Sequence, residues 1–275
     1  MSLLRFTILG SGSSGGVPRA NGDWGACDPS EPKNRRRRCS LLVERAENRK
    51  AFEIGEAVTR VLVDTSPDFR EQMLAAGVSR LDAVLYTHDH ADQTHGIDDL
   101  RIFVLAARKR MPVWTNASTA KSLLVRFGYA FNAPAGSPYP AIFEHCALPA
   151  PGEGLEIDGP GGVITAENYE QAHGGITALG FRFGPVAYSP DVSAIPDESF
   201  DILEGIDTFI VDSLRDSPHG THFSVEDALG AIKRTRARRG VLTNLHIDLD
   251  YKDLSARTPG NVDIAFDGLQ LEFEV

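Results

Sequence analysis

The 275-residue sequence has few cysteines, no long hydrophobic run and no excess of basic charge. Three cysteines form an odd and small set in a chain of this size, which argues against a disulfide framework and favours a reducing compartment. The longest apolar run, residues 102–107, is far shorter than the roughly 18 residues of a membrane-spanning helix. Arg5 and Thr7 interrupt the apolar N-terminal stretch, and no cleavage-site pattern follows it. We therefore expect a cytoplasmic location and no membrane partner.

The charge balance is acidic, since 28 basic side chains against 38 acidic ones give a formal charge of −10. This balance makes binding to bulk nucleic acid unfavourable. The basic run at residues 33–38 is a dense local exception. Such a run usually forms a solvated loop, and near the mouth of a site it could instead attract phosphates. Hydrophobic residues at 42% are ordinary for a globular protein, so we expect one folded domain over residues 1–275.

Strand-like and helix-like runs alternate along most of the chain, which predicts a layered α/β architecture. Ser66-Pro67-Asp68 is typical of a helix start, and Gly77 of the end of that helix. Ser224 and Asp227 form a capping-box signature for a later helix that we expect to stop at Gly240. Strands are expected at 3–9, 60–63, 81–87, 111–114, around 181–188, at 208–211 and at 241–245; further helices at 97–107 and at 118–127, the latter closed by Gly128; loops and short strands over 132–162; and a hairpin turn at Asp267-Gly268.

A glycine-rich segment after the first expected strand matches the dinucleotide-binding pattern G-x-G-x-x-G at residues 10–15. That pattern requires a helix to begin within it, because the helix N-terminus holds the pyrophosphate. The continuation over residues 16–22 contains Pro18 and two further glycines and cannot sustain a helix. We therefore reject a nicotinamide or flavin site. Two readings remain, a tight connection between strands and a loop that presents backbone amides to a ligand.

Residues 87–96 contain three of the chain's eight histidines and two carboxylates, directly after an apolar strand. His88 and His90 are two residues apart at the strand end, so their side chains can face the same side. Asp92 lies where the next helix begins. Two imidazoles and a carboxylate that converge at a strand end suit Zn, Mn or Fe. Single histidines are often structural, but a set this dense indicates a metal site.

The histidine motif resembles the metal motif of the metallo-β-lactamase superfamily. Three other segments are similar to the phosphoribosyl cyclic phosphate phosphodiesterase group of that superfamily, namely residues 10–18, 64–70 and 96–101. The resemblance extends from about residue 3 to residue 254. It implies an α/β fold, the αβ/βα four-layer sandwich, with two divalent transition metals, Mn or Zn, at one edge.

The resemblance, together with the positions of the residues in this chain, assigns roles to residues that are distant in the sequence. The first metal is expected to bind His88, His90, His173 and Asp191, and the second to bind Asp92, Asp191 and His246. The residues expected to orient these ligands without touching metal are Asp64, Gln93, His95 and Asn244. The residues alone leave one alternative open, because Asp191 follows Pro190 and could simply cap a turn.

Two positions depart from the superfamily pattern. Gln93 stands where a histidine of the second metal is expected, and Asn244 stands where the late strand often ends in histidine. His246 lies two residues beyond Asn244 and points to the same side if the strand continues, so we expect it to substitute as a ligand. With fewer strong donors, the second site is expected to bind metal more weakly than the first.

Several residues bear on catalysis and substrate binding. In the resembling phosphodiesterases, the histidine that matches His222 acts as a general acid beside the metals; His219 is the less favoured candidate. An alkoxide leaves poorly whereas an alcohol leaves easily, so a positioned acid contributes ~100- to 10,000-fold. We therefore expect Asp92 and His222 to be catalytic, and Ser189 and Thr221 to contact the substrate.

Cys27 and Cys39 fall where the resembling group carries a cysteine-rich zinc loop. They lie 12 residues apart without a C-x-x-C pair, so we expect no structural zinc there.

The resemblance and the residues together predict a metal-dependent hydrolase that cleaves phosphodiesters with a hydroxide bridging two metals. The expected partner is a small cyclic phosphoribosyl or nucleotide phosphodiester. The alternatives are a tRNA 3′-end endonuclease, a thioester or lactam hydrolase on the same fold, and a nucleotide-binding module with a decayed second metal site. The sequence does not decide whether the chain forms a homodimer.

Overall fold

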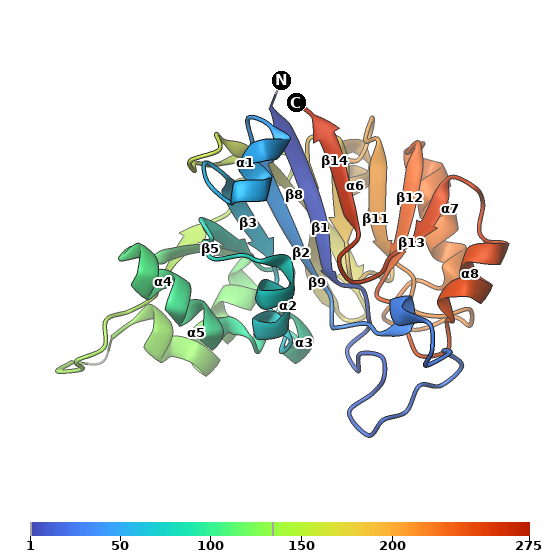
Figure 1. Ribbon diagram of the computed structural model, residues 1–275, viewed down its shortest axis with the longest axis horizontal. Helices are drawn as coiled ribbons and strands as arrows, with labels where there is room; N and C mark the ends of the chain where they lie inside the picture. Colours follow the sequence, from blue (N-terminus) through green and yellow to red (C-terminus); the bar gives the residue numbers. More distant parts are fainter. Residues whose placement is uncertain (1, 134) are drawn as a thin grey trace.

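Two seven-stranded sheets pack face to face in the computed structural model, which describes residues 2–133 and 135–275 (Figure 1). Helices cover the outer face of each sheet, so the chain forms four layers, as expected for the αβ/βα sandwich. The two chain termini lie side by side at one edge of the sandwich (Figure 1). Every helix in the described part of the chain is too short or too polar to cross a lipid bilayer.

The first sheet combines antiparallel strands at one side with parallel strands at the other. Its strands, in spatial order, are β14 (Gln270–Glu274), β1 (Leu3–Gly10), β2 (Ser40–Ala46), β3 (Thr59–Val63), β4 (Ala83–Leu85), β5 (Met111–Thr115) and β6 (Phe143–Ala147). The second sheet has the same division into parallel and antiparallel parts. Its strands, in spatial order, are β13 (Val262–Ile264), β12 (Arg239–Thr243), β11 (Thr208–Asp212), β10 (Val186–Ser189), β9 (Ile176–Phe183), β8 (Ile164–His173) and β7 (Gly154–Ile157).

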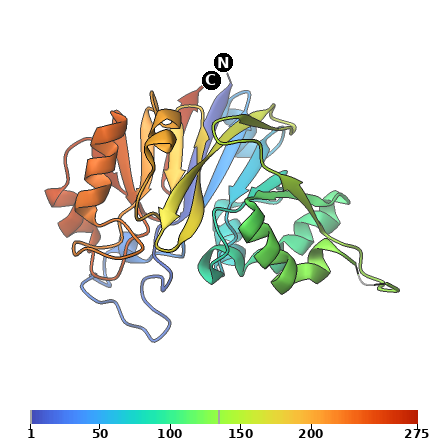
Figure 2. The same ribbon diagram turned by 180° about the vertical axis from the view of Figure 1, so that it is seen from behind.

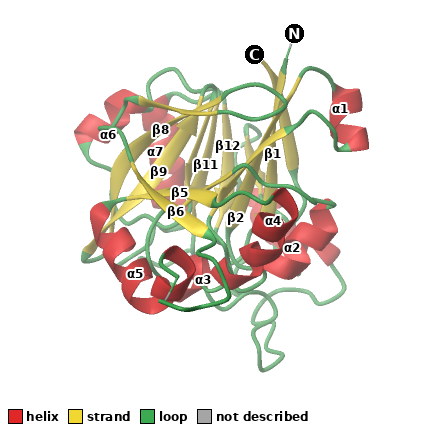
Figure 3. Ribbon diagram, turned by 90° about the vertical axis from the view of Figure 1, so that its left-hand side faces the viewer, coloured by secondary structure: helices red, strands yellow, loops and turns green. Residues whose placement is uncertain are grey.

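The helices divide between the two outer faces (Figures 1 and 3). The helices of the first half are α1 (Arg49–Ile54), α2 (Phe69–Ala76), α3 (Ala91–Thr94), α4 (Arg101–Ala107) and α5 (Ala117–Phe131), with the short 3₁₀ helices η1 (Pro32–Asn34) and η2 (Ile97–Leu100). The second sheet is covered by α6 (Asp197–Ile202), α7 (Val225–Thr235) and α8 (Tyr251–Arg257), seen from behind in Figure 2.

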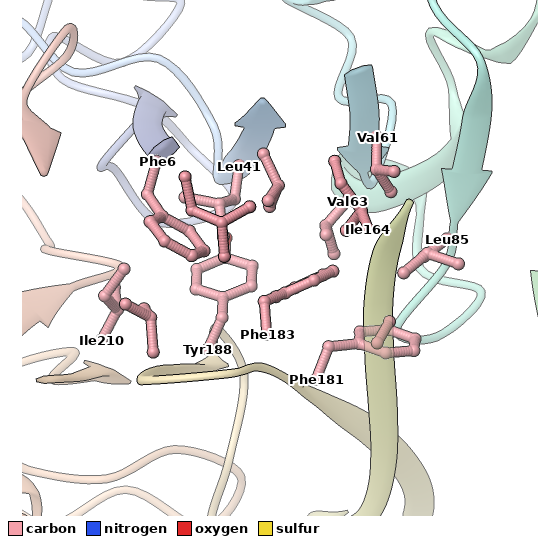
Figure 4. Close-up of a cluster of buried hydrophobic side chains, with 14 of the residues drawn as sticks. Phe6, Leu41, Val61, Val63, Leu85, Ile164, Phe181, Phe183, Tyr188 and Ile210 are labelled. Atoms are coloured by element: carbon pink, nitrogen blue, oxygen red, sulfur yellow. The ribbon is translucent and has the colours of Figure 1, made fainter. Parts of the chain in front are cut away.

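The hydrophobic core between the sheets follows from alternation along the strands (Figure 4). On β3, Val61 and Val63 point into the space between the sheets, whereas Leu62 faces the helices α2 and α4. Phe6 on β1 meets Phe183 on β9 across the sandwich, with ring centroids 6.2 Å apart. Because both faces of β3 are covered, all five of its residues are buried.

One strand, β2, was not apparent from the sequence because it carries two charged residues. Its Glu44 is only 2% exposed and accepts hydrogen bonds from Arg5 and Arg60 on the flanking strands. Glu44 therefore pairs with arginines of the neighbouring strands instead of reaching solvent. This pairing explains why a central strand lacks a clean hydrophobic pattern.

Two expected helix ends are wrong. The helix expected to close at Gly128 continues as α5 to Phe131, with a kink at Phe127. The helix α7 begins at the expected capping box, but it ends at Thr235, where Arg236 takes a left-handed conformation. Gly240 instead lies inside β12. A glycine is needed at this position because a Cβ would come within 2.4 Å of Ile232 Cδ1 on α7.

The hairpin expected at Asp267-Gly268 is also wrong. The strand before this turn, β13, pairs with β12 in the second sheet, whereas β14 after it pairs with β1 in the first. The turn therefore carries the chain from one sheet to the other. The Asp267 carboxylate holds the turn by accepting hydrogen bonds from Ser11 and Arg37.

The basic run at residues 33–38 is packed against the body of the protein, contrary to the expectation of a solvated loop. Arg36 is only 2% exposed and donates to the carbonyl of His246. Arg37 and Arg38 form ion pairs with Asp267 and Asp68. The glycine-rich segment makes this packing possible, since a Cβ at position 10 would lie 2.0 Å from the carbonyl oxygen of Arg38. As expected, no helix begins in that segment of the described chain.

Candidate metal centre

Three imidazoles converge near the start of α3. The helix α3 lies at the edge of the sandwich opposite the chain termini (Figure 1). His88 and His90 follow β4, and His173 is the last residue of β8. Ring centroids lie 4.6 Å apart for His88 and His90, and 4.9 and 5.0 Å apart for His173 with each of them. One nitrogen from each ring lies within 4.8 Å of the other two. The structure thus brings together the three histidines that the sequence placed on the first metal.

A buried hydrogen-bond chain fixes the orientation of His88. The carboxylate of Asp64, just after β3, accepts from the Thr87 backbone N–H at 2.9 Å and from the Thr87 hydroxyl at 2.8 Å. The Thr87 hydroxyl oxygen in turn lies 3.0 Å from His88 Nδ1. Because that hydroxyl donates to Asp64, it accepts from His88 Nδ1–H, which leaves the lone pair on Nε2. Asp64 therefore lies at the start of the hydrogen-bond chain that reaches His88.

The donor set fits a metal ion. His88 Nε2 is buried and has no hydrogen-bond partner among the described residues. Burial holds the pKa of His88 well below its usual value and lowers the pKa of His173 to about 4. Both rings are therefore uncharged at neutral pH, as a metal ligand must be. His173 Nδ1 donates to the Thr221 carbonyl at 2.6 Å, so its Nε2 faces His90 Nδ1, 3.2 Å away.

A group of carboxylates and amides lies on the other side of His173. Asp191 follows β10 and Asp212 ends β11, and both side chains are buried. Gln93 Nε2 donates to Asp191 Oδ2 at 2.9 Å, and Asn244 Nδ2 lies 3.3 Å from Asp191 Oδ1 and 2.9 Å from Asp212 Oδ1. Burial, with the nearby charge of Asp92, raises the pKa of Asp191 well above its ordinary value. Asp191, His173 and His222 each have a ligand atom within 4.8 Å of the other two, so Asp191 and His173 are close enough to share a cation.

His222 stands beside this carboxylate group. Its Nδ1 lies 2.8 Å from Asp212 Oδ2, and its ring packs against His173 at a centroid distance of 4.7 Å. The side chain keeps 15% of its surface exposed. The Ser224 N-cap of α7, two residues later, fixes the loop that carries His222. Asp212 had no role in the sequence analysis, although one signal pointed to it: it ends a buried parallel strand, as Asp64 and Asp191 follow theirs.

The structure does not bring His246 to this group. β12 ends at Thr243, and Asn244 adopts a left-handed conformation with φ of 60°, so the expected strand continuation is wrong. The chain turns away at Asn244, and His246 Nε2 contacts the guanidinium of Arg19 at 2.5 Å while its Nδ1 contacts Asp248 at 2.8 Å. The expected trio of Asp92, Asp191 and His246 is therefore not assembled.

The remaining predicted residues lie around the group in different settings. Asp92 is half-buried, with Oδ2 3.3 Å from Gln93 Nε2. His95 is exposed and packs edge-on against Phe127, away from the ligands. Ser189 is fully buried and bonded to a tyrosine hydroxyl at 2.7 Å, so a substrate does not reach it. The Thr221 carbonyl binds His173, while its hydroxyl lies 3.1 Å from His219 Nδ1.

The two N-terminal cysteines occupy separate buried places. Cys27 Sγ donates to the backbone carbonyls of Ile247 and Leu249. Cys39 Sγ lies 3.8 Å from the side chains of Thr243 and Asn244. Each thiol thus contributes to packing of the loop after β12.

Comparison with known proteins found a matching family model and several solved structures with a similar fold. A family model described as the beta-lactamase superfamily domain matches residues 59–247. The crystal structure of a diphosphatase from the PhnP family superposes over 99% of this chain and 98% of its own, with a TM-score of 0.84 and 33% identity. The YhfI protein of Bacillus subtilis, at 19% identity, shares the fold with a TM-score of 0.70 over 99% and 100% of the two chains. The short form of human tRNase Z, at 16% identity, does so with 0.63 over 97% and 98%.

A curated relative is longer than this chain. The Porphyromonas gingivalis protein named octanoyltransferase is 30% identical over 272 residues, which make up 97% of this chain and 51% of the relative. The chain thus spans about half the length of that relative.

Proposed function

Because the chain belongs to the β-lactamase superfamily, whose fold is hydrolytic, we propose that it is a metal-dependent hydrolase that cleaves phosphodiesters. The observation that carries this proposal is the pair of Asp212 and His222, set against the imidazole group. Asp212 accepts from His222 Nδ1–H and so leaves Nε2 as the atom that exchanges a proton with the substrate. An acid held in this way serves a substrate whose leaving group needs a proton.

This pair favours a phosphodiester over a thioester. A thiolate leaves without protonation because thiols have a pKa near ~8.5, whereas the alkoxide of a sugar or nucleoside does not. The relative named octanoyltransferase raises an acyl substrate as the second candidate. Release of a thiolate from an acyl thioester would not need the proton that His222 and Asp212 are placed to supply. The diphosphatase at 33% identity supports a substrate with a phosphoryl centre.

The ligands would hold a divalent transition metal such as Mn or Zn at His88, His90, His173 and Asp191, where it would supply a Lewis acid for the phosphoryl oxygens and make water more acidic. Asp64 and Thr87 keep His88 Nε2 directed at that place. Asp92, half-buried beside Gln93, is the proposed acceptor for the proton of the attacking water.

Arg19 is a cation in the neighbourhood of His222. Its contact, His246, is among the charged groups that act on His219, and the His219 ring lies 5.3 Å from that of His222. Arg19 projects from the loop after β1 and contacts His246, two residues beyond Asn244. Among the described residues, Arg19 forms no ion pair with a carboxylate, unlike Arg37 and Arg38. A guanidinium with free donors binds phosphate oxygens well. We propose a cyclic phosphoribosyl or nucleotide phosphodiester as the substrate class, with Arg19 as a contact to it.

The test is a substrate panel after reconstitution of the metal-free protein with Mn or Zn. The panel compares bis(p-nitrophenyl) phosphate, cyclic and linear nucleotide phosphodiesters, and an acyl thioester. The proposal expects turnover of phosphodiesters and little of the thioester, with the His88→Ala/His90→Ala variant as the control. Turnover of the thioester alone would replace the proposal with the acyl alternative.

A further inference from the structure

Two side-chain amides, Gln93 and Asn244, occupy positions where the superfamily pattern places histidines of a second metal. We infer that these amides donate hydrogen bonds to Asp191 in place of that metal, so that the chain holds one metal ion and not two. The inference rests on the proposed metal site at His88, His90 and His173. It concerns this chain's own residues and corrects the two-metal expectation from the sequence.

The hydrogen bonds to Asp191 carry the first step. Gln93 Nε2 donates to Oδ2 at 2.9 Å, and Asn244 Nδ2 approaches Oδ1 at 3.3 Å, so each carboxylate oxygen faces an amide nitrogen. Gln93 is 0% exposed and Asn244 is 1% exposed. An amide nitrogen carries protons and has no lone pair for a cation. In this arrangement both oxygens of Asp191 face amide nitrogens, where a carboxylate shared by two metals would face a second cation.

The orientation of both amides follows from the partners of their nitrogens, since Gln93 Oε1 has no partner among the described residues. Gln93 Nε2 also lies 3.3 Å from Asp92 Oδ2, and Asn244 Nδ2 lies 2.9 Å from Asp212 Oδ1. Each nitrogen therefore sits between two carboxylates. If either amide were turned by 180°, its oxygen would face both carboxylates and be repelled by them. The network thus selects the donor orientation at both positions.

The third step is the loss of the remaining ligand. A second metal at the expected place would need a histidine after β12, and His246 is engaged by Arg19 and Asp248 instead. Asn244 accounts for this displacement, because its left-handed φ of 60° turns the chain, and asparagine tolerates that conformation better than most residues. Only Asp92 and Asp191 of the expected trio remain near each other, and two carboxylates alone bind a transition metal poorly.

With an amide in place of a histidine, Asn244 also helps to position Asp212, the partner of His222. Asn244 Nδ2 donates to Asp212 Oδ1 and approaches Asp191 Oδ1, so one amide links Asp191 on the metal side to Asp212, which in turn accepts from His222 Nδ1–H. Without a second cation in competition, Asp212 remains the partner of His222. His222 lies within reach of a cation shared with His173 and Asp191, and its bond to Asp212 is what holds it as a proton donor in our account.

The test counts metal ions without relying on activity. Metal-free wild type is titrated with MnCl₂ by calorimetry, and electron paramagnetic resonance distinguishes an isolated Mn²⁺ ion from an exchange-coupled pair. We expect one equivalent and the spectrum of an isolated ion. The Gln93→His/Asn244→His variant should gain a second equivalent and a coupled spectrum, whereas His246→Ala should bind one equivalent, like wild type.

Three outcomes would overturn the inference in different ways. Two equivalents with a coupled spectrum in wild type, one of them lost in His246→Ala, would restore the two-metal site and leave the proposed hydrolase intact. A folded double-histidine variant, checked by circular dichroism, that still binds one equivalent would show that the amides do not exclude the second ion. No binding at all would overturn the proposed metal site itself. If the double variant fails to fold, the wild-type spectrum alone decides.

Discussion

The two sides of the site differ in the kind of polar atom that they leave without a partner. On the imidazole side, His88 Nε2 is buried and lacks a partner among the described residues. On the carboxylate side, all four carboxylate oxygens of Asp191 and Asp212 receive hydrogen bonds, from Gln93, Asn244, His222 and the Val192 backbone. The atom without a partner there is an amide oxygen, Gln93 Oε1. A buried polar atom without a partner is rare unless a ligand completes it. Because three imidazoles converge there, we place the proposed cation on the imidazole side, and the proposed proton donor on the carboxylate side.

The largest expected effect comes from removing the imidazole side. The His88→Ala/His90→Ala variant should bind no transition metal and should cleave phosphodiesters no faster than buffer, because His173 and Asp191 alone do not hold the ion. Metal analysis after gel filtration measures the first and a turnover assay the second. Retention of a full equivalent of metal would break the comparison, since the cation would then lie elsewhere.

Removing the acid should spare the metal. The His222→Ala variant should bind metal like wild type, while cleavage of esters with alcohol leaving groups slows by ~100- to 10,000-fold. Cleavage of p-nitrophenyl esters should slow much less, because nitrophenolate departs without a proton. An equal loss for both kinds of substrate, or a loss of metal, would assign His222 to the imidazole side.

A smaller effect is expected when the acid is kept but its partner is changed. Asp212→Asn preserves the shape of the side chain and removes the charge that stabilises protonated His222. Turnover of alkyl phosphodiesters should fall by ~10- to 100-fold, with a shifted pH profile and unchanged metal content. A fall in rate without any change in the pH profile would mean that Asp212 acts on packing alone.

The last effect is expected on stability and not on turnover, at Asp64. Burial raises the pKa of Asp64 to about 8, opposed by its bonds to Thr87, whereas in the unfolded chain it is near ~3.9. Between these values the folded metal-free protein holds a proton that the unfolded chain releases. This contribution to stability is therefore complete below about pH 4 and is lost as the pH rises towards 8.

Asp64→Asn removes that dependence and serves as its own comparison. From pH 5 to pH 8, metal-free wild type should lose up to ~1.4 kcal/mol of unfolding free energy per pH unit relative to the variant. Urea denaturation in the presence of a chelator measures both proteins. Parallel stability curves would show that the carboxyl is already ionised in the fold.

The sequence predicted the imidazole side better than the carboxylate side, and the reason is local geometry. His88 and His90 form a short motif at one strand end, so their proximity needs only the β-strand period. His246 was wrongly placed because that inference required β12 to continue, and the left-handed Asn244 ends it. The pairing of Asp212 with His222 depends on a loop between β11 and α7, whose path no periodicity specifies.

The fold prediction shows the same difference between elements that neighbouring residues specify and elements that depend on distant partners. Strands such as β1, β3 and β11 were predicted from their apolar runs, and the capping box of α7 from its own residues. The strand β2 escaped notice because Glu44 pairs with Arg60 on the neighbouring strand. The turn at Asp267 looked like a hairpin, because the sequence does not reveal that its two strands belong to different sheets.

The most direct test of the whole account is the rate of phosphodiester cleavage as metal is added back, one fraction of an equivalent at a time, to the metal-free protein. The account predicts that the rate rises linearly and reaches its plateau at one Mn²⁺ per chain, because the imidazole side holds the only ion that the reaction needs. A rate that stays at background until a second equivalent binds, or no cleavage at any metal content, would contradict it.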